Sequence, residues 1–117
     1  MKASMPSRDI YTVSRLNQDV RVLLEGEFPA LWVEGEVSNL SRPSSGHLYF
    51  SLKDARAQIR CALFQNRALL FRDSPRNGQQ ILVRGRLSLY EARGEFHLAG
   101  HAVVPLADIF HETHALA

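Results

Sequence analysis

The spacing of the apolar residues changes at Pro29, and this change limits what the 117-residue chain can fold into. Before Pro29, apolar side chains recur every three or four residues, as on one face of an α-helix. After Pro29 they alternate with polar residues, as in a β-strand that has one buried face. The sequence therefore predicts a mainly β domain with an added N-terminal helix.

The helix is expected from about Thr12 to Phe28, where Thr12 or Ser14 can supply the capping oxygen and Pro29 ends the helix. Residues 1–10 show no periodicity and are expected to form a flexible arm. The helix has a stripe of apolar residues on one side and mixed charges on the other, which predicts that it packs on a protein core. Its apolar residues are Val13, Leu16, Val20, Leu23 and Leu24.

Five segments after Pro29 show the alternation of a strand, and we place them at about 31–38, 47–53, 56–65, 80–90 and 95–104. Turn residues separate them at 41–46, 54–55, 74–78 and 92–94. Gly85 marks a bulge or bend in the fourth strand. The side chains expected to face inward are Leu31, Val33, Gly35, Val37, Leu48, Phe50, Leu52, Ala57, Ile59, Cys61, Leu63, Ile81, Val83, Gly85, Leu87 and Leu89.

Residues 66–73 interrupt the alternation, and Asn66 can cap a short helix there. Three strands, a connecting helix and two more strands are the arrangement of the OB-fold, a five-stranded, partly open barrel. We therefore expect one OB-fold domain at 11–105, with a short helix between the third and fourth strands. Residues 106–117 would form a C-terminal tail.

The charge of the chain is uneven and favours an anionic partner. Residues 42–101 contain ten basic and four acidic residues, whereas the net charge of the whole chain is only +2. OB-folds bind oligonucleotides on the face of their second and third strands, where cations contact phosphates and rings stack on bases. The residues expected to contact nucleic acid are Trp32, Arg42, His47, Tyr49, Lys53, Arg60, Phe64, Arg84, Arg86 and Arg93.

Catalytic and metal-binding patterns are weak. His97 and His101 are four residues apart on one strand, too far apart to share a metal ion, and His111 and His114 have no third ligand after them. Cys61 is expected to be inert core packing. No apolar run approaches the ~20 residues of a membrane span. We expect no cofactor, no metal and no membrane contact.

Several blocks resemble the N-terminal OB-fold domain of the exonuclease VII large subunit. The first is Thr12-Val13-Ser14-Arg15-Leu16-Asn17, and the second runs from Trp32 to Asn39. The most specific is Ser45-Gly46-His47-Leu48-Tyr49-Phe50-Ser51-Leu52-Lys53-Asp54. Arg60-Cys61-Ala62-Leu63-Phe64, Gly78, Tyr90 and Gly94 follow in order.

This resemblance implies a cytoplasmic enzyme that degrades single-stranded DNA into oligonucleotides without a divalent metal. In that family a large subunit works with several small subunits, and its OB-fold is thought to hold the DNA. The regions for catalysis and for small-subunit binding follow the barrel, whereas this chain departs from the family after Pro105 and looks like a domain-sized fragment or a truncated homologue.

Three functions remain open. The chain is a module that binds single-stranded DNA, or an intact nuclease, or a barrel that binds a partner protein through Trp32, Tyr49 and Phe64. No acid, base and nucleophile set assembles in the sequence, which argues against the nuclease. Phosphate binding should weaken steeply as salt rises, which separates the first hypothesis from the third.

Overall fold

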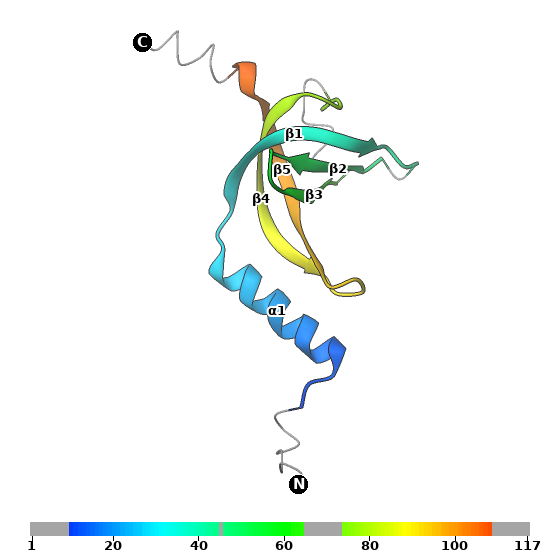
Figure 1. Cartoon of the computed structure of the whole chain (residues 1–117), viewed down its shortest axis with the longest axis vertical. Helices are drawn as coiled ribbons and strands as arrows, with labels where there is room; N and C mark the ends of the chain where they lie inside the picture. The colour runs from blue at the N-terminus through cyan, green and yellow to red at the C-terminus, as the bar shows by residue number, and fades with distance from the viewer. Residues whose placement is uncertain (1–9, 45, 65–73, 109–117) are drawn as a thin grey trace.

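The computed structural model describes residues 10–44, 46–64 and 74–108. Five strands close into a barrel in the order β1-β2-β3-β5-β4, with one helix outside it (Figure 1). β3 and β5 are parallel, and the other neighbours are antiparallel. The predicted five-stranded OB barrel with an N-terminal helix is confirmed. The elements are α1 (Val13–Glu27), β1 (Leu31–Ser41), β2 (Leu48–Lys53), β3 (Gln58–Leu63), β4 (Gln80–Tyr90) and β5 (Glu95–Pro105).

The barrel interior is filled by the inward residues of all five strands, because alternate side chains of a strand point to opposite faces. Phe50, Leu63, Ile81 and Leu98 are completely or almost completely buried there. Every residue predicted to face inward that belongs to β1–β5 is buried or half-buried. Ala57 was placed wrongly: it lies in the turn before β3, where its carbonyl accepts a hydrogen bond from Asp54 N at 3.0 Å, and its side chain is exposed.

Gly85 lies at the irregularity that the sequence predicted. The register between β4 and β5 shifts between Arg84 and Gly85, and β1 also begins to pair with β4 at this position. A Cβ atom at Gly85 would lie 2.5 Å from the carbonyl oxygen of Ala99. Only glycine therefore lets the strands approach this closely, and the bulge bends β4 as closure of the barrel requires.

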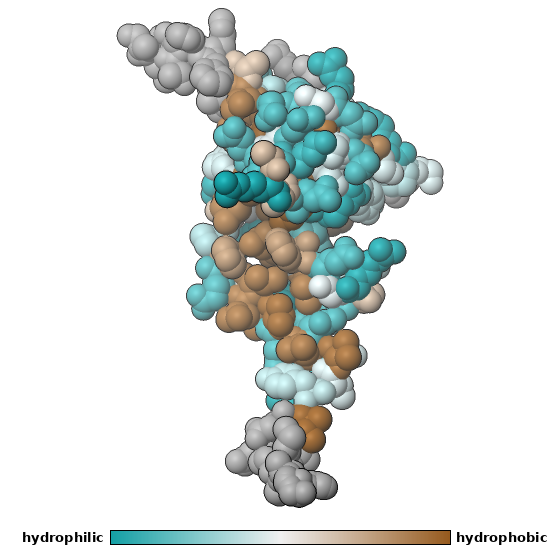
Figure 2. Space-filling view, in the orientation of Figure 1, coloured by the Kyte–Doolittle hydropathy of each residue, from teal (hydrophilic) through white to brown (hydrophobic). Residues whose placement is uncertain are grey.

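Helix α1 begins as predicted, because Thr12 accepts a hydrogen bond from Arg15 N at 3.1 Å and caps it. The expected packing of its whole apolar stripe on a core is wrong: no residue of α1 is buried, and Val13 and Leu23 are 77% and 60% exposed. Only Val20 and Leu24 of the stripe are half-buried. The helix contacts β4, and its apolar surface is visible in the lower part of Figure 2. β1 pairs with β4 only up to Gly85, so α1 lies beside the part of β4 that β1 leaves uncovered (Figure 1).

Three further details differ from the sequence prediction or lie outside the described residues. β1 continues to Ser41 through an irregularity after Ser38, with Asn39 at φ 53°. The short helix expected at residues 66–73, between the third and fourth strands, falls outside the described residues. Among the described residues, a short helical segment follows the last strand instead, at residues 106–108.

Candidate nucleic-acid interface

The outer surface of β2, β3 and β5 carries two adjoining depressions of about 550 and 350 Å³, which we call the barrel groove. Both are lined by Arg60, Glu95 and Phe96. The end of β4, the start of β5 and the turn that joins them line one side of the groove, and we call this segment, residues 90–96, the arm. The other residues that line the larger depression are Tyr49, Cys61, Ala62, Phe64, Tyr90, Arg93 and His97.

Small side chains and one arginine form the floor of the groove. Ser51 and Ala62 occupy outward positions of β2 and β3, yet both are buried. Ser51 lies opposite Arg60 and accepts a hydrogen bond from Arg60 Nη1 at 3.0 Å. The guanidinium is thereby held along the floor, where a cation can meet a phosphate group.

Aromatic rings stand at the β2–β3 end of the groove. The ring of His47 meets the rings of Tyr49 and Phe64 edge to face, at centroid distances of 6.3 and 5.3 Å. Phe64 is 42% exposed. The register of the β2–β3 pair explains this cluster, because it sets Leu48 opposite Leu63 and so brings the neighbouring His47 beside Phe64. These rings can stack on unpaired bases.

The groove also contains residues that the sequence analysis missed: Tyr90, Glu95 and Phe96 belong to the arm, and His97 follows it in β5. Tyr90 and Phe96 are 53% and 54% exposed. The available signal was their place on either side of the 92–94 turn, since OB-folds also bind ligands with the loop between the fourth and fifth strands. Burial lowers the pKa of His97, and nearby Glu25 opposes that shift. The neutral ring is therefore favoured in the unliganded groove.

Two predicted contacts lie on a different wall of the barrel. Trp32 of β1 pairs with Arg84 of β4, and the guanidinium carbon of Arg84 lies 5.7 Å from the centroid of the Trp32 ring. β1 and β4 adjoin each other, whereas the groove lies on β2, β3 and β5. Arg86 is exposed on β4, opposite Ala99 of β5, between this wall and the groove.

Arg42 and Lys53 also lie apart from the groove. Arg42 donates hydrogen bonds to Ser74 Oγ at 3.2 Å and to the carbonyl of Pro75 at 3.3 Å, so it ties the end of β1 to the segment before β4. Lys53 lines a depression that it shares with Glu34, Glu36 and Asp54. Of the ten predicted residues, Tyr49, Arg60, Phe64 and Arg93 line the groove, and His47 contacts two of these.

The described residues offer little for metal or thiol chemistry. No three His, Cys, Asp or Glu side chains gather there as a metal site would require, and His111 and His114 lie outside these residues. Burial raises the pKa of Cys61 to about 12, so the thiol stays protonated and unreactive at neutral pH. Among the described residues, no helix is long and apolar enough to cross a membrane, α1 included.

Comparisons with known proteins agree with this architecture. Residues 11–103 match the family described as OB-fold nucleic acid binding domain. The chain is 61% identical over 95 residues to the exodeoxyribonuclease 7 large subunit of Thioalkalivibrio sulfidiphilus, covering 81% of this chain and 21% of that subunit. It is 55% identical over 101 residues to the same subunit of Pseudomonas aeruginosa, covering 86% and 22%.

A solved structure shares the fold. One chain in a structure of a replication protein A heterotrimer bound to ssDNA superposes with a TM-score of 0.55 at 21% sequence identity, covering 75% of this chain and 71% of that one. This likeness shows the fold alone. The sequence spans about a fifth of the curated large subunits that it matches.

The barrel topology, the match over residues 11–103 and the identity to these subunits lead to one conclusion. The chain belongs to the family of OB-fold nucleic acid binding domains, and within that family it is the kind found in exodeoxyribonuclease 7 large subunits.

Proposed function

We propose that this chain binds single-stranded DNA in the barrel groove. Within a full large subunit, it would hold the DNA strand for a nuclease centre elsewhere in the enzyme. That enzyme would work in the cytoplasm together with small subunits. The observation that carries the proposal is the gathering of Tyr49, Phe64, Tyr90 and Phe96 around the cations of Arg60 and Arg93. Rings and cations on one surface are what a protein needs to bind a single strand without reading its sequence.

The rings that line the groove favour a single strand over a duplex. Unpaired bases can turn toward the protein and stack on rings, whereas in a duplex the bases are stacked on each other and paired. The replication protein A structure, a heterotrimer bound to ssDNA, gives this use of the fold a precedent. We assign no hydrolysis to the groove, and degradation of DNA would belong to the longer protein.

Photo-crosslinking tests where the strand lies. A poly-thymidine oligonucleotide with 5-bromouracil at single positions would be irradiated with the chain, and the crosslinked peptides would be identified by mass spectrometry. We expect crosslinks to Tyr49, Phe64, Tyr90 or Phe96. Crosslinks confined to Trp32 would move the site to the β1–β4 wall, where the sequence also predicts contacts with Arg84 and Arg86.

A second candidate function uses the same exposed rings to anchor a partner protein in subunit assembly. The exposed apolar side chains of the helix, such as Val13 and Leu23, favour it. Salt separates the two, because binding to a single strand loses affinity with a slope of about −0.7 per neutralised phosphate in a plot of log affinity against log salt. An apolar protein interface would show little such dependence.

A further inference from the structure

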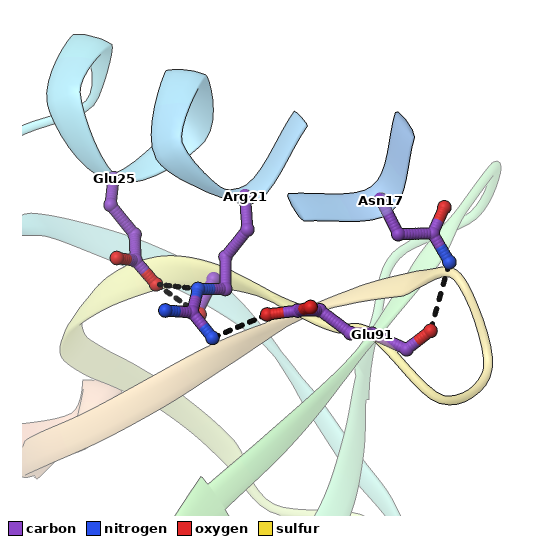
Figure 3. Close-up of polar contacts among 5 residues, drawn as sticks. Asn17, Arg21, Glu25 and Glu91 are labelled. Carbon is purple, nitrogen blue, oxygen red and sulfur yellow. Dashed lines mark hydrogen bonds and ion pairs between the residues drawn. The ribbon is translucent and has the colours of Figure 1, made fainter. Parts of the chain in front are cut away.

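A polar network joins helix α1 to the arm of the groove. Arg21 forms an ion pair with the carboxylate of Glu91, and Asn17 Nδ2 donates a hydrogen bond to the carbonyl of Glu91 at 2.8 Å. Figure 3 shows these side chains reaching from the helix to the turn between β4 and β5. The helix therefore holds both the side chain and the backbone of one arm residue.

The network extends along β4. Ser88 Oγ donates a hydrogen bond to Glu25 Oε2 at 2.6 Å, and Glu25 also pairs with Arg21, with 3.5 Å between Glu25 Oε2 and Arg21 Nε. Ser88 lies opposite His97, a residue that lines the groove. Three consecutive turns of α1 thus contact the strand and turn that carry one side of the groove.

The residue that the helix holds lies between the residues that line the groove. Tyr90 precedes Glu91, and Arg93 and Phe96 follow it. The turn itself is closed by two hydrogen bonds to the carbonyl of Tyr90, from Arg93 N at 3.1 Å and from Gly94 N at 2.9 Å. Asn17 also lies over Gly94, since a Cβ atom there would be 3.5 Å from Asn17 Nδ2.

We propose that Glu91 is a positioning residue for single-strand binding: through Asn17 and Arg21, α1 holds the arm in the place where Tyr90, Arg93 and Phe96 can contact the strand. The inference rests on the proposed function of the groove. Glu91 itself would not touch the DNA, because its carboxylate is directed to the helix (Figure 3). Because the arm is already in position, the binding of a DNA strand does not carry the free-energy cost of ordering the arm.

Whether the affinity for DNA rises or falls when Glu91 is replaced separates a positioning role from a direct electrostatic one. Removing a negative charge near bound phosphates strengthens binding if charge alone matters. Glu91→Ala should instead weaken binding by about twofold to fivefold, the range that one exposed ion pair contributes. Glu95→Ala is the matched control on the same arm: Glu95 lines the groove and shows no ion pair within the described residues, so its removal should strengthen binding.

A double-mutant cycle identifies the contact that matters. Arg21→Ala should weaken binding to a similar extent, and Arg21→Ala with Glu91→Ala should be no weaker than either single variant. The slope of affinity against salt should stay as in the wild type, because Arg21 neutralises no phosphate in this account. Asp19→Ala, at an exposed helix position, should leave affinity unchanged.

Hydrogen exchange tests the positioning without DNA. The amides of Arg93 and Gly94 should exchange faster in Glu91→Ala than in the wild type, while the amides of β2 and β3 should not change. Equal exchange in the arm, or binding by Glu91→Ala as tight as by the wild type, would overturn the inference. A wild-type chain that binds no single strand would overturn the proposed function, and the exchange result would still decide whether the helix holds the arm.

Discussion

Arg60 Nη1 donates a hydrogen bond to the buried hydroxyl of Ser51, 3.0 Å away across the β2–β3 pair. A long arginine side chain usually loses much rotational freedom when it binds a ligand. This bond restricts the guanidinium before any ligand arrives and keeps it on the floor of the groove. The relationship makes Arg60 the cation of the groove whose position is best defined by the fold.

Tyr49→Ala and Arg60→Ala should each weaken binding to single-stranded DNA while the chain stays folded. Loss of a stacking ring costs about 1–3 kcal/mol of binding free energy per base. Tyr49→Phe keeps the ring and should bind nearly as the wild type does. Fluorescence anisotropy with a labelled oligonucleotide measures the affinity, and circular dichroism checks the fold. Folded variants with unchanged binding would show that the strand lies elsewhere.

Leu63→Ala should destabilise the domain without involving the groove, because Leu63 is fully buried in the barrel core. A buried leucine that is cut to alanine costs about 2–5 kcal/mol of unfolding free energy. Gln58→Ala, at an exposed position of the same strand, should change it by no more than about 0.5 kcal/mol. Urea denaturation followed by circular dichroism gives both values, and equal midpoints would contradict the inward and outward assignment of β3.

The two glycine positions Gly85 and Gly26 should respond in opposite ways to alanine. At Gly85 a Cβ atom would overlap the carbonyl of Ala99, so Gly85→Ala should cost about 1–3 kcal/mol of unfolding free energy. At Gly26, in α1, the new methyl group meets nothing within 4 Å, and the better helix propensity of alanine should add about 0.5–1 kcal/mol. Thermal denaturation of the two variants provides the comparison, and a tolerated Gly85→Ala would refute the close approach of the strands.

His97 should make DNA binding depend on pH. Its pKa in the folded chain is lowered by burial, so its contribution to stability is present above its ordinary pKa of 6.5 and is lost as the pH falls below that value. Bound phosphate favours the protonated ring and opposes the shift. Affinity for single-stranded DNA should therefore rise between about pH 7.5 and about pH 5.5, and more in the wild type than in His97→Gln. Parallel pH profiles in the two proteins would exclude His97 from the site.

Alternation in the sequence was sufficient to predict the barrel and most of its core. Phe50, Leu63 and Ile81 are buried where the period of two places them, and Gly85 is at the bulge. Helix α1 begins where Thr12 can cap it. Each of these features depends on local patterns, which a single sequence contains.

The groove could be predicted only in part. Alternation shows which side chains point out of the barrel, but not on which side of the barrel each of them lies. Trp32 and Tyr49 are both outward residues, yet one belongs to the β1–β4 wall and the other to the groove. Tyr90 and Phe96 join the groove because the arm bends beside β3, a relationship between residues distant in the chain. The apolar stripe of α1 predicted core packing, whereas the stripe is at most half-buried and Asn17, Arg21 and Glu25 make the polar contacts to β4 and the arm.

Binding of single-stranded DNA by the barrel is tested by titrating a labelled ~20-nucleotide poly-thymidine strand with this chain and following the fluorescence anisotropy. Such a strand exceeds the ~4–16 nucleotides that one OB-fold covers. A matched duplex is titrated alongside, at about 50 mM and about 200 mM salt. We expect the single strand to bind more tightly than the duplex and its affinity to fall as the salt concentration rises. Equal binding of both DNAs, or no binding of the single strand at the lower salt, would contradict this expectation.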